Sequence, residues 1–191
     1  MNPLACAGFL VVTFVLAGAA QTVWLRSRLS DRLALPLDLG KTFRGRRILG
    51  ANKTLRGFVV MVPATALSFF AVGLLVARSE ALNTMLWSLS PVGYGMLGLV
   101  AGLGFMLGEL PNSFMKRQLG IPPGESPRRW PAKITTFIID RLDSIVGMLA
   151  AVTLAVPTPW KTWLYVVLFG PAVHWSFSLV LYAIGVKERP A

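Results

Sequence analysis

Apolar residues fall into five long runs separated by shorter polar segments. The runs cover residues 4–25, 57–77, 91–110, 134–156 and 162–186. Each is long enough, or nearly so, to cross a hydrocarbon core, which needs about 20 helical residues. Because every backbone N–H and C=O group must be paired inside lipid, open strands cannot cross and these runs are expected to be helices. The pattern predicts an all-α integral membrane protein with five transmembrane helices, forming one domain over residues 1–191.

Composition agrees with a membrane protein. Hydrophobic residues make up 54% of the chain and charged residues 14%, with a mean hydropathy of +0.63, whereas charged residues are about 25% of a soluble domain. The formal net charge of +11 would also suit a nucleic-acid binder. However, the basic residues lie in short blocks between apolar runs, which is typical of membrane-side loops that contact phosphates. We therefore expect no nucleic-acid partner.

The basic residues also predict the orientation. Nine Lys or Arg lie in residues 26–56, five in 116–133 and two in 187–189, whereas Arg78 and Lys161 are alone in the alternate connections. By the positive-inside rule the N-terminus faces out, and the loops at about 26–56 and 111–133 face the cytoplasm together with the C-terminus. We expect a multi-pass protein of the cell membrane whose active site faces the cytoplasm.

The third run contains two Gly-x-x-x-Gly spacings, Gly98/Gly102 and Gly104/Gly108. Such spacings let helix backbones approach closely, so this helix is expected to pack against protein. We favour packing within the chain. A homodimer seam stays open, because the same motif serves both arrangements.

The fourth run holds charge at membrane depth. Only 13 residues, 144–156, are free of charge. These are too few to cross, so the helix must include Asp140, Arg141 and Asp143. An ionisable residue at that depth costs about 2.5–3.5 kcal/mol on insertion scales and marks a functional site by default.

The two aspartates suit a magnesium ion. Three residues apart on a helix, Asp140 and Asp143 share a face. Mg²⁺ usually takes one or two protein carboxylates and completes its shell with water and phosphate oxygens. Glu109, near the end of the third run, is a third candidate ligand. The alternative is an ion pair of Asp140 with Arg141 or another basic residue, which would only fix helix packing.

Two sets of residues offer donors to phosphate groups. On the helix face that carries Glu109, Ser113 and Arg117 follow four and eight residues later, with Lys116 at seven. The first basic loop combines glycines, Arg forks, Lys ammonium groups and Thr hydroxyls. Its candidate substrate ligands are Lys41, Thr42, Arg44, Lys53, Thr54 and Arg56. The alternative is a loop that touches anionic headgroups.

The missing residue types narrow the chemistry. His174 is the only histidine and lies in the fifth run, away from any serine-rich elbow, which argues against a Ser-His triad. Without a general base, the nucleophile must already be ionised at pH 7, as a phosphate with a second pKa of about 6 is. A lipid phosphate that attacks a nucleotide fits, with metal and basic residues stabilising the charge.

Four segments resemble the CDP-archaeol synthase family and, more distantly, the CDP-diacylglycerol synthases. They are residues 38–47, 52–57, 108–125 and 140–144, with Asn-Lys-Thr-Leu-Arg-Gly, Ser-x-x-Lys-Arg and Asp-Arg-Leu-Asp among them. The resemblance implies a Mg²⁺-dependent enzyme that transfers CMP from CTP to a membrane lipid phosphate, either phosphatidate or an ether lipid, and releases pyrophosphate.

The resemblance also implies roles for the candidate residues. Asp140 and Asp143 match metal ligands, and Ser113, Lys116 and Arg117 match phosphate contacts; we assign Lys116 to catalysis with the two aspartates. Glu109 stands where the family pattern has aspartate, and residues 127–136 lack the His-Gly-Gly of the CDP-diacylglycerol synthases. The choice of lipid therefore stays open. The alternative function is a non-catalytic membrane protein that binds or moves an anionic lipid or solute.

Overall fold

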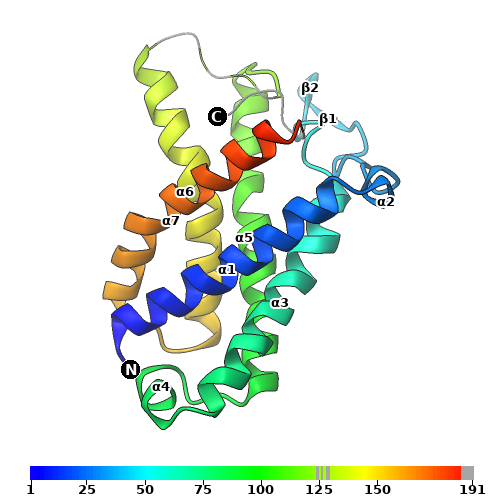
Figure 1. Cartoon of the computed structure of the whole chain (residues 1–191). Coiled ribbons are helices and arrows are strands. Elements are labelled where there is room, and N and C mark those ends of the chain that lie inside the picture. The colour runs from blue at the N-terminus through cyan, green and yellow to red at the C-terminus, as the bar shows by residue number, and fades with distance from the viewer. Residues whose placement is uncertain (124, 126, 128–129, 186–191) are drawn as a thin grey trace.

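Five long helices make up most of the structure, a computed structural model that describes residues 1–123, 125, 127 and 130–185 (Figure 1). They are α1 (Pro3–Leu25), α3 (Leu55–Ala77), α5 (Pro91–Gln118), α6 (Trp130–Ala155) and α7 (Trp160–Ala183). The short elements are α2 (Arg28–Asp31), α4 (Glu80–Met85), β1 (Thr42–Phe43) and β2 (Arg46–Arg47). The side chain of His174, the end of the fifth predicted run and the basic tail lie outside what is described.

Four of the long helices, α1, α3, α5 and α7, are long and apolar enough to cross a membrane. The fifth, α6, has the length, but every 18-residue window within it contains Asp140, Arg141 and Asp143. The helices support a multi-pass membrane protein. The count of five spans and the orientation of the N-terminus stay predictions.

The helix α5 lies between α3 and α6, and α1 crosses the bundle diagonally against α3 and α7 (Figure 1). One end of the bundle carries the β1–β2 hairpin, α2, the end of α5 and the start of α6. The other end carries α4 and the N-terminus, where the Asn2 N–H donates to the Met85 carbonyl at 2.7 Å. The first basic loop therefore lies at the end of the bundle where α6 begins.

The glycines of α5 pack against two different helices. A Cβ on Gly98 would lie 2.8 Å from the Cα of Ala66 on α3. A Cβ on Gly108 would collide with the Asp143 carbonyl and with Gly147 on α6. Both glycine spacings therefore serve packing within the chain, which confirms the interpretation that we favoured; a homodimer stays a prediction.

The helix α5 is longer than the third apolar run predicted. It continues past Leu110, through Pro111, and ends at Gln118. Membrane helices tolerate an internal proline because neighbouring groups satisfy the freed backbone. The second basic connection therefore begins after Gln118 rather than at residue 111, and Glu109, Ser113 and Arg117 lie on one helix.

Replacing Gly108 with Ala should separate α5 from α6. Overpacking of this kind costs roughly 1–3 kcal/mol, so we expect a lower midpoint of thermal unfolding in detergent. Gly8→Ala is the matched control, because a Cβ there meets no atom within 4 Å. Equal midpoints for the two variants would contradict the close contact of α5 with α6.

Candidate active site

Three carboxylates lie where α5 meets α6. Glu109 comes from α5, and Asp140 and Asp143 come from α6. The side-chain amide of Asn112, one turn beyond Glu109, donates to Asp140 Oδ1 and to Asp143 Oδ2, both at 2.7 Å. The two aspartates therefore point at a single position, as their spacing predicted.

Ser144 joins the aspartates to Glu109. Its hydroxyl lies 2.9 Å from Glu109 Oε1 and 3.2 Å from Asp143 Oδ1, and its backbone N–H donates to Asp143 Oδ1 at 2.7 Å. Ser144 is 1% exposed. A single hydroxyl proton can serve only one of the two carboxylates at a time, so Ser144 ties the two helices together through one shared donor.

Two lysines bring positive charge to the cluster. Lys53, which precedes α3, pairs with Glu109, and Lys116 of α5 pairs with Asp140. Burial alone would lower the pKa of Lys53, but the attraction and hydrogen bond of Glu109 outweigh it, so the pKa is raised. Asp143 accepts hydrogen bonds from the neutral donors Asn112 and Ser144.

The donor set fits a hard divalent cation. Among the described residues no group of three His, Cys, Asp or Glu is arranged to hold a metal, because Asn112, Ser144 and the lysines lie between the carboxylates. Oxygen ligands from two convergent carboxylates are nevertheless what Mg²⁺ takes from proteins. Asp140 and Asp143 are the residues that would hold such an ion, and their roles as ligands, like that of Glu109, stay predictions.

Ser113 and Arg117 form a second part of the site, further along α5. The Ser113 hydroxyl accepts from the Gly50 N–H at 3.3 Å, which fixes the first basic loop on the helix. Arg117 is 8% exposed, and its Nε–H has no hydrogen-bond partner in the described part of the chain. A buried guanidinium with a free donor is suited to bind an anion.

Asp38 organises the first basic loop. Its buried carboxylate accepts from the N–H groups of Gly40 and Leu49, both at 3.0 Å, and pairs with Arg47. Burial by itself would raise the pKa of Asp38, but these hydrogen bonds and the Arg47 charge outweigh it and hold the pKa below its usual value.

The β1–β2 hairpin packs on the end of α5. Arg46 donates to the Gln118 carbonyl, and Gln118 Nε2 donates to the Arg47 carbonyl at 3.2 Å. The turn places Arg44 and Gly45 at φ of 52° and 75°, the left-handed region used by tight hairpins. The loop is thus fixed at both Ser113 and Gln118.

The other predicted loop residues lie outside the carboxylate cluster. Lys41, Thr42 and Arg44 are exposed on the hairpin, and no side-chain hydrogen bond or ion pair joins them to the carboxylates within the described residues. Thr54 is the N-cap residue of α3 but makes no side-chain cap bond. Arg56 pairs with Asp31 at 3.8 Å. Their roles as substrate ligands stay predictions.

The ion pair that we considered as an alternative exists with a different partner. Arg141 turns back on its own helix, with its guanidinium carbon 3.3 Å from the centre of the Phe137 ring and Nη1 2.9 Å from the Phe137 carbonyl. Asp140 pairs with Lys116 instead. This pair explains Asp140, but it does not explain the second aspartate.

Asn112, Ser144 and Asp38 are residues that the sequence reasoning left without a role. All three lie inside segments that carry the family resemblance. Neutral polar side chains at membrane depth, next to carboxylates, were the available signal for Asn112 and Ser144, because buried polar groups need partners. Asp38 gave no signal of its own, since its partners are mostly backbone N–H groups.

Comparisons with known proteins identify the family of this chain. Residues 33–191 match the CarS-like CDP-archaeol synthase family. The chain belongs to the CDP-archaeol synthase family. It is 34% identical over 163 residues to the CDP-archaeol synthase of Halobacterium salinarum, covering 81% of this chain and 82% of that protein. It is also 34% identical over 166 residues to that of Methanoculleus marisnigri, covering 81% and 89%.

A solved structure of an intramembrane enzyme for archaeal membrane lipid biosynthesis has a similar fold. Its TM-score is 0.55 at 23% identity, over 94% of this chain and 92% of that one. The likeness supports the arrangement of helices. Membership of the CDP-archaeol synthase family implies a CTP-using transferase that acts on an archaeal lipid phosphate.

Replacing Asp38 with Asn should loosen the first basic loop. The neutral amide loses the Arg47 pair, so trypsin should cleave after Arg44, Arg46 or Arg47 several times faster. Because the pKa of Asp38 is lowered, its carboxylate stabilises the loop above a pH of about 4, and this is lost as pH falls through the lowered pKa. Asp31→Asn is the control, since that side chain is 74% exposed. Unchanged cleavage in Asp38→Asn would contradict the assignment.

Proposed function

We propose that this chain transfers CMP from CTP to the phosphate of an archaeal ether lipid, with Mg²⁺ held by Asp140 and Asp143. The observation that supports this best is the convergence of two carboxylates on one point beside Asn112. The family match and the names of the relatives from Halobacterium and Methanoculleus supply the substrates. The basic end of the bundle faces the cytoplasm, where CTP is available.

The reaction needs no protein base. An oxygen of the lipid phosphate, ionised at pH 7, attacks the α-phosphorus of CTP. The bond from that phosphorus to the bridging oxygen breaks, and pyrophosphate leaves with the electron pair. Catalysis then consists of placing the two phosphates and neutralising their charge. This explains how a chain with a single histidine can carry the activity.

We expect the two lysines to pair with carboxylates before substrates bind and with phosphate oxygens in the substrate-bound site. Lys116 and Lys53 now pair with Asp140 and Glu109. Each ammonium sits on a flexible stem, so each can exchange its carboxylate for a phosphate oxygen when substrates arrive. When bound at the aspartates, Mg²⁺ would supply the positive charge that Lys116 now gives to Asp140.

We expect Arg117 and the loop backbone to bind the nucleotide phosphates. The Nε–H of Arg117 has no partner in the described part of the chain, and Nη1 of the same side chain lies close to the loop, where a Cβ on Gly50 would come 3.0 Å from Nη1 and 2.3 Å from Asn52 Oδ1. Only glycine leaves this approach open. A phosphate at Arg117 lies one turn of α5 from Ser113 and about two turns from Glu109, while Asp140 pairs with the adjacent Lys116.

The purified chain in lipid vesicles, with labelled CTP and Mg²⁺, should convert an ether-lipid phosphate to a CDP-lipid and release one pyrophosphate per product. A diacyl phosphatidate tested in parallel shows whether the enzyme also accepts an ester-linked lipid phosphate. The absence of product with any lipid phosphate, from folded protein, would contradict the proposal.

Asp143→Asn should lower kcat by roughly 100-fold or more, as the loss of a charge-stabilising group does, while thermal unfolding changes little because an amide can keep one of the two hydrogen bonds. Glu80→Gln, exposed at the opposite end of the bundle, is the control and should keep full activity. Wild-type turnover in Asp143→Asn would contradict the assignment of Asp143 as a metal ligand.

A further inference from the structure

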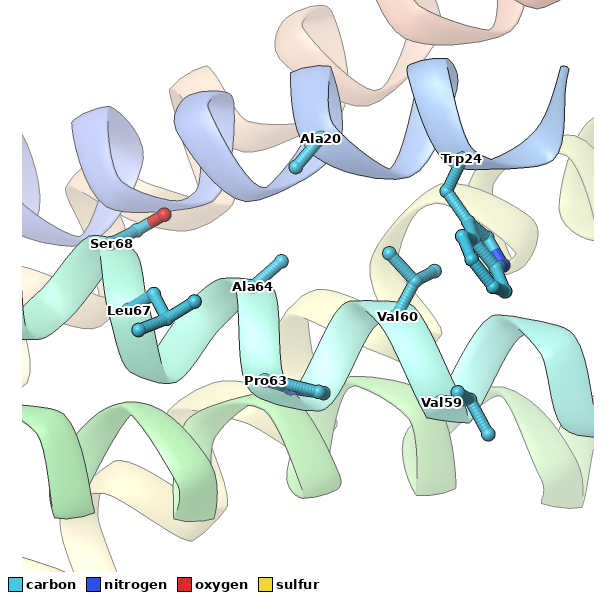
Figure 2. Close-up of a pocket in the computed structure, with 8 residues that line it drawn as sticks. All are labelled: Ala20, Trp24, Val59, Val60, Pro63, Ala64, Leu67 and Ser68. Atoms are coloured by element: carbon cyan, nitrogen blue, oxygen red, sulfur yellow. The ribbon is translucent and has the colours of Figure 1, made fainter. Parts of the chain in front are cut away.

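An apolar groove opens between α1 and α3. It has a volume of about 400 Å³, within the range of small-molecule sites. Figure 2 shows Ala20 and Trp24 on the α1 side, facing Val60 and Ala64 on α3. The two alanines leave room between the helices, and Pro63 lies on the same stretch of α3. Because α1 and α3 are both candidate membrane spans, hydrocarbon is the surrounding medium.

A hydrogen-bond donor without a partner lies at one end of the groove. The indole Nε1–H of Trp24 is buried and has no partner in the described part of the chain. Tryptophan in membrane proteins usually turns this N–H towards a polar headgroup. An occupant that satisfies Trp24 must therefore have an oxygen at this end and an apolar body beyond it.

The same end is positively charged. Arg56 precedes Val60 by four residues and Ala64 by eight, so it lies on the groove face of α3. Its ion pair with Asp31 is loose, at 3.8 Å, and the Asp31 side chain is 74% exposed, so this pair is worth little. On the other wall, α1 is followed at once by Arg26 and Arg28.

The chain segment that enters α3 at the basic end of the groove also reaches the carboxylate cluster. Lys53, three residues before Arg56, contacts Glu109. From Val60 to Lys53 the chain covers about 10 Å, mostly at the helical rise of 1.5 Å per residue. A phosphate held at Arg56 therefore lies close to the site, while its hydrocarbon chain lies between α1 and α3.

We infer that this groove binds one hydrocarbon chain of the lipid phosphate substrate, with the phosphate at Arg56 and an oxygen near the glycerol accepting from Trp24. The inference rests on the proposed function and names the place where its lipid enters. It assigns the substrate, rather than bulk lipid, because Arg56 follows Lys53 by three residues and Lys53 pairs with Glu109 of the carboxylate cluster.

Photolabelling of the wild-type protein tests the inference without turnover. An ether-lipid phosphate that carries a diazirine midway along one chain should label peptides of α1 and α3. Excess unlabelled lipid phosphate should suppress the labelling, whereas the same diether lipid without its phosphate should not. Labelling elsewhere, or equal suppression by both lipids, would overturn the inference; the second result would make the groove a general lipid contact.

Substitutions in the groove test its use in turnover. Ala20→Phe should raise the KM for the lipid phosphate about tenfold and leave the KM for CTP unchanged. Ala19→Phe, one position along the same helix and outside the groove, is the matched control. Trp24→Phe, which removes only the indole N–H, should raise the lipid KM about fivefold, the size of one hydrogen bond. An unchanged lipid KM in both groove variants would overturn the inference.

The two proposals fail in different ways. If wild-type protein makes no CDP-lipid, yet phosphate-dependent labelling maps to α1 and α3, the proposed function fails and the groove stands. If turnover is normal and the label maps to other helices, the groove fails and the function stands.

Discussion

The close contact between α5 and α6 is the constraint on which the site depends. Gly104 and Gly108 of α5 face Gly147 of α6 without side chains between them. At this separation Asn112 can reach both Asp140 and Asp143, and Ser144 can reach Glu109. A helix pair held a residue's width further apart would take Asn112 out of reach of Asp140 and Asp143, and unpaired carboxylates at membrane depth are costly. The close packing of α5 on α6 is therefore also what brings the polar side chains of the site together.

Charge compensation follows from that contact. Three carboxylates and two ammonium groups lie in the cluster, with Lys53 delivered by the first basic loop. The loop in turn is fixed by Asp38 from within and by Ser113 and Gln118 from α5. A loop that carries a cluster lysine and lies against Arg117 is positioned to respond to an anion, because Lys53 sits on a flexible stem and the Arg117 Nε–H has no partner in the described part of the chain. Two buried side-chain N–H groups lack a partner in the described part of the chain, the Arg117 Nε–H on α5 and the Trp24 Nε1–H on α1.

Much of the fold could be predicted from the sequence, since long apolar runs and glycine spacings are local signals. The ends of the elements were harder: α5 runs through Pro111 to Gln118 because tertiary neighbours stabilise it, and no local pattern reports that. In the site, Asp140 and Asp143 were predictable, because placing an ionisable side chain at membrane depth costs free energy and so indicates a function. Asn112 and Ser144 were not, because a neutral polar residue gains its role only from partners on another helix. Lys41, Thr42 and Arg44 were named for their chemistry, and the hairpin leaves them exposed, since residue type does not report distance from the carboxylates.

The central claim is that Asp140 and Asp143 form one cation-binding point that opens to substrate phosphate. Electron paramagnetic resonance of Mn²⁺, a spectroscopic substitute for Mg²⁺, measures this directly in the presence of CTP and without lipid. We expect saturable binding to the wild-type protein, loss of that binding in the Asp140→Asn, Asp143→Asn double variant, and release of the ion by excess Mg²⁺. Equal Mn²⁺ binding by the wild type and the double variant, or none by either, would contradict it.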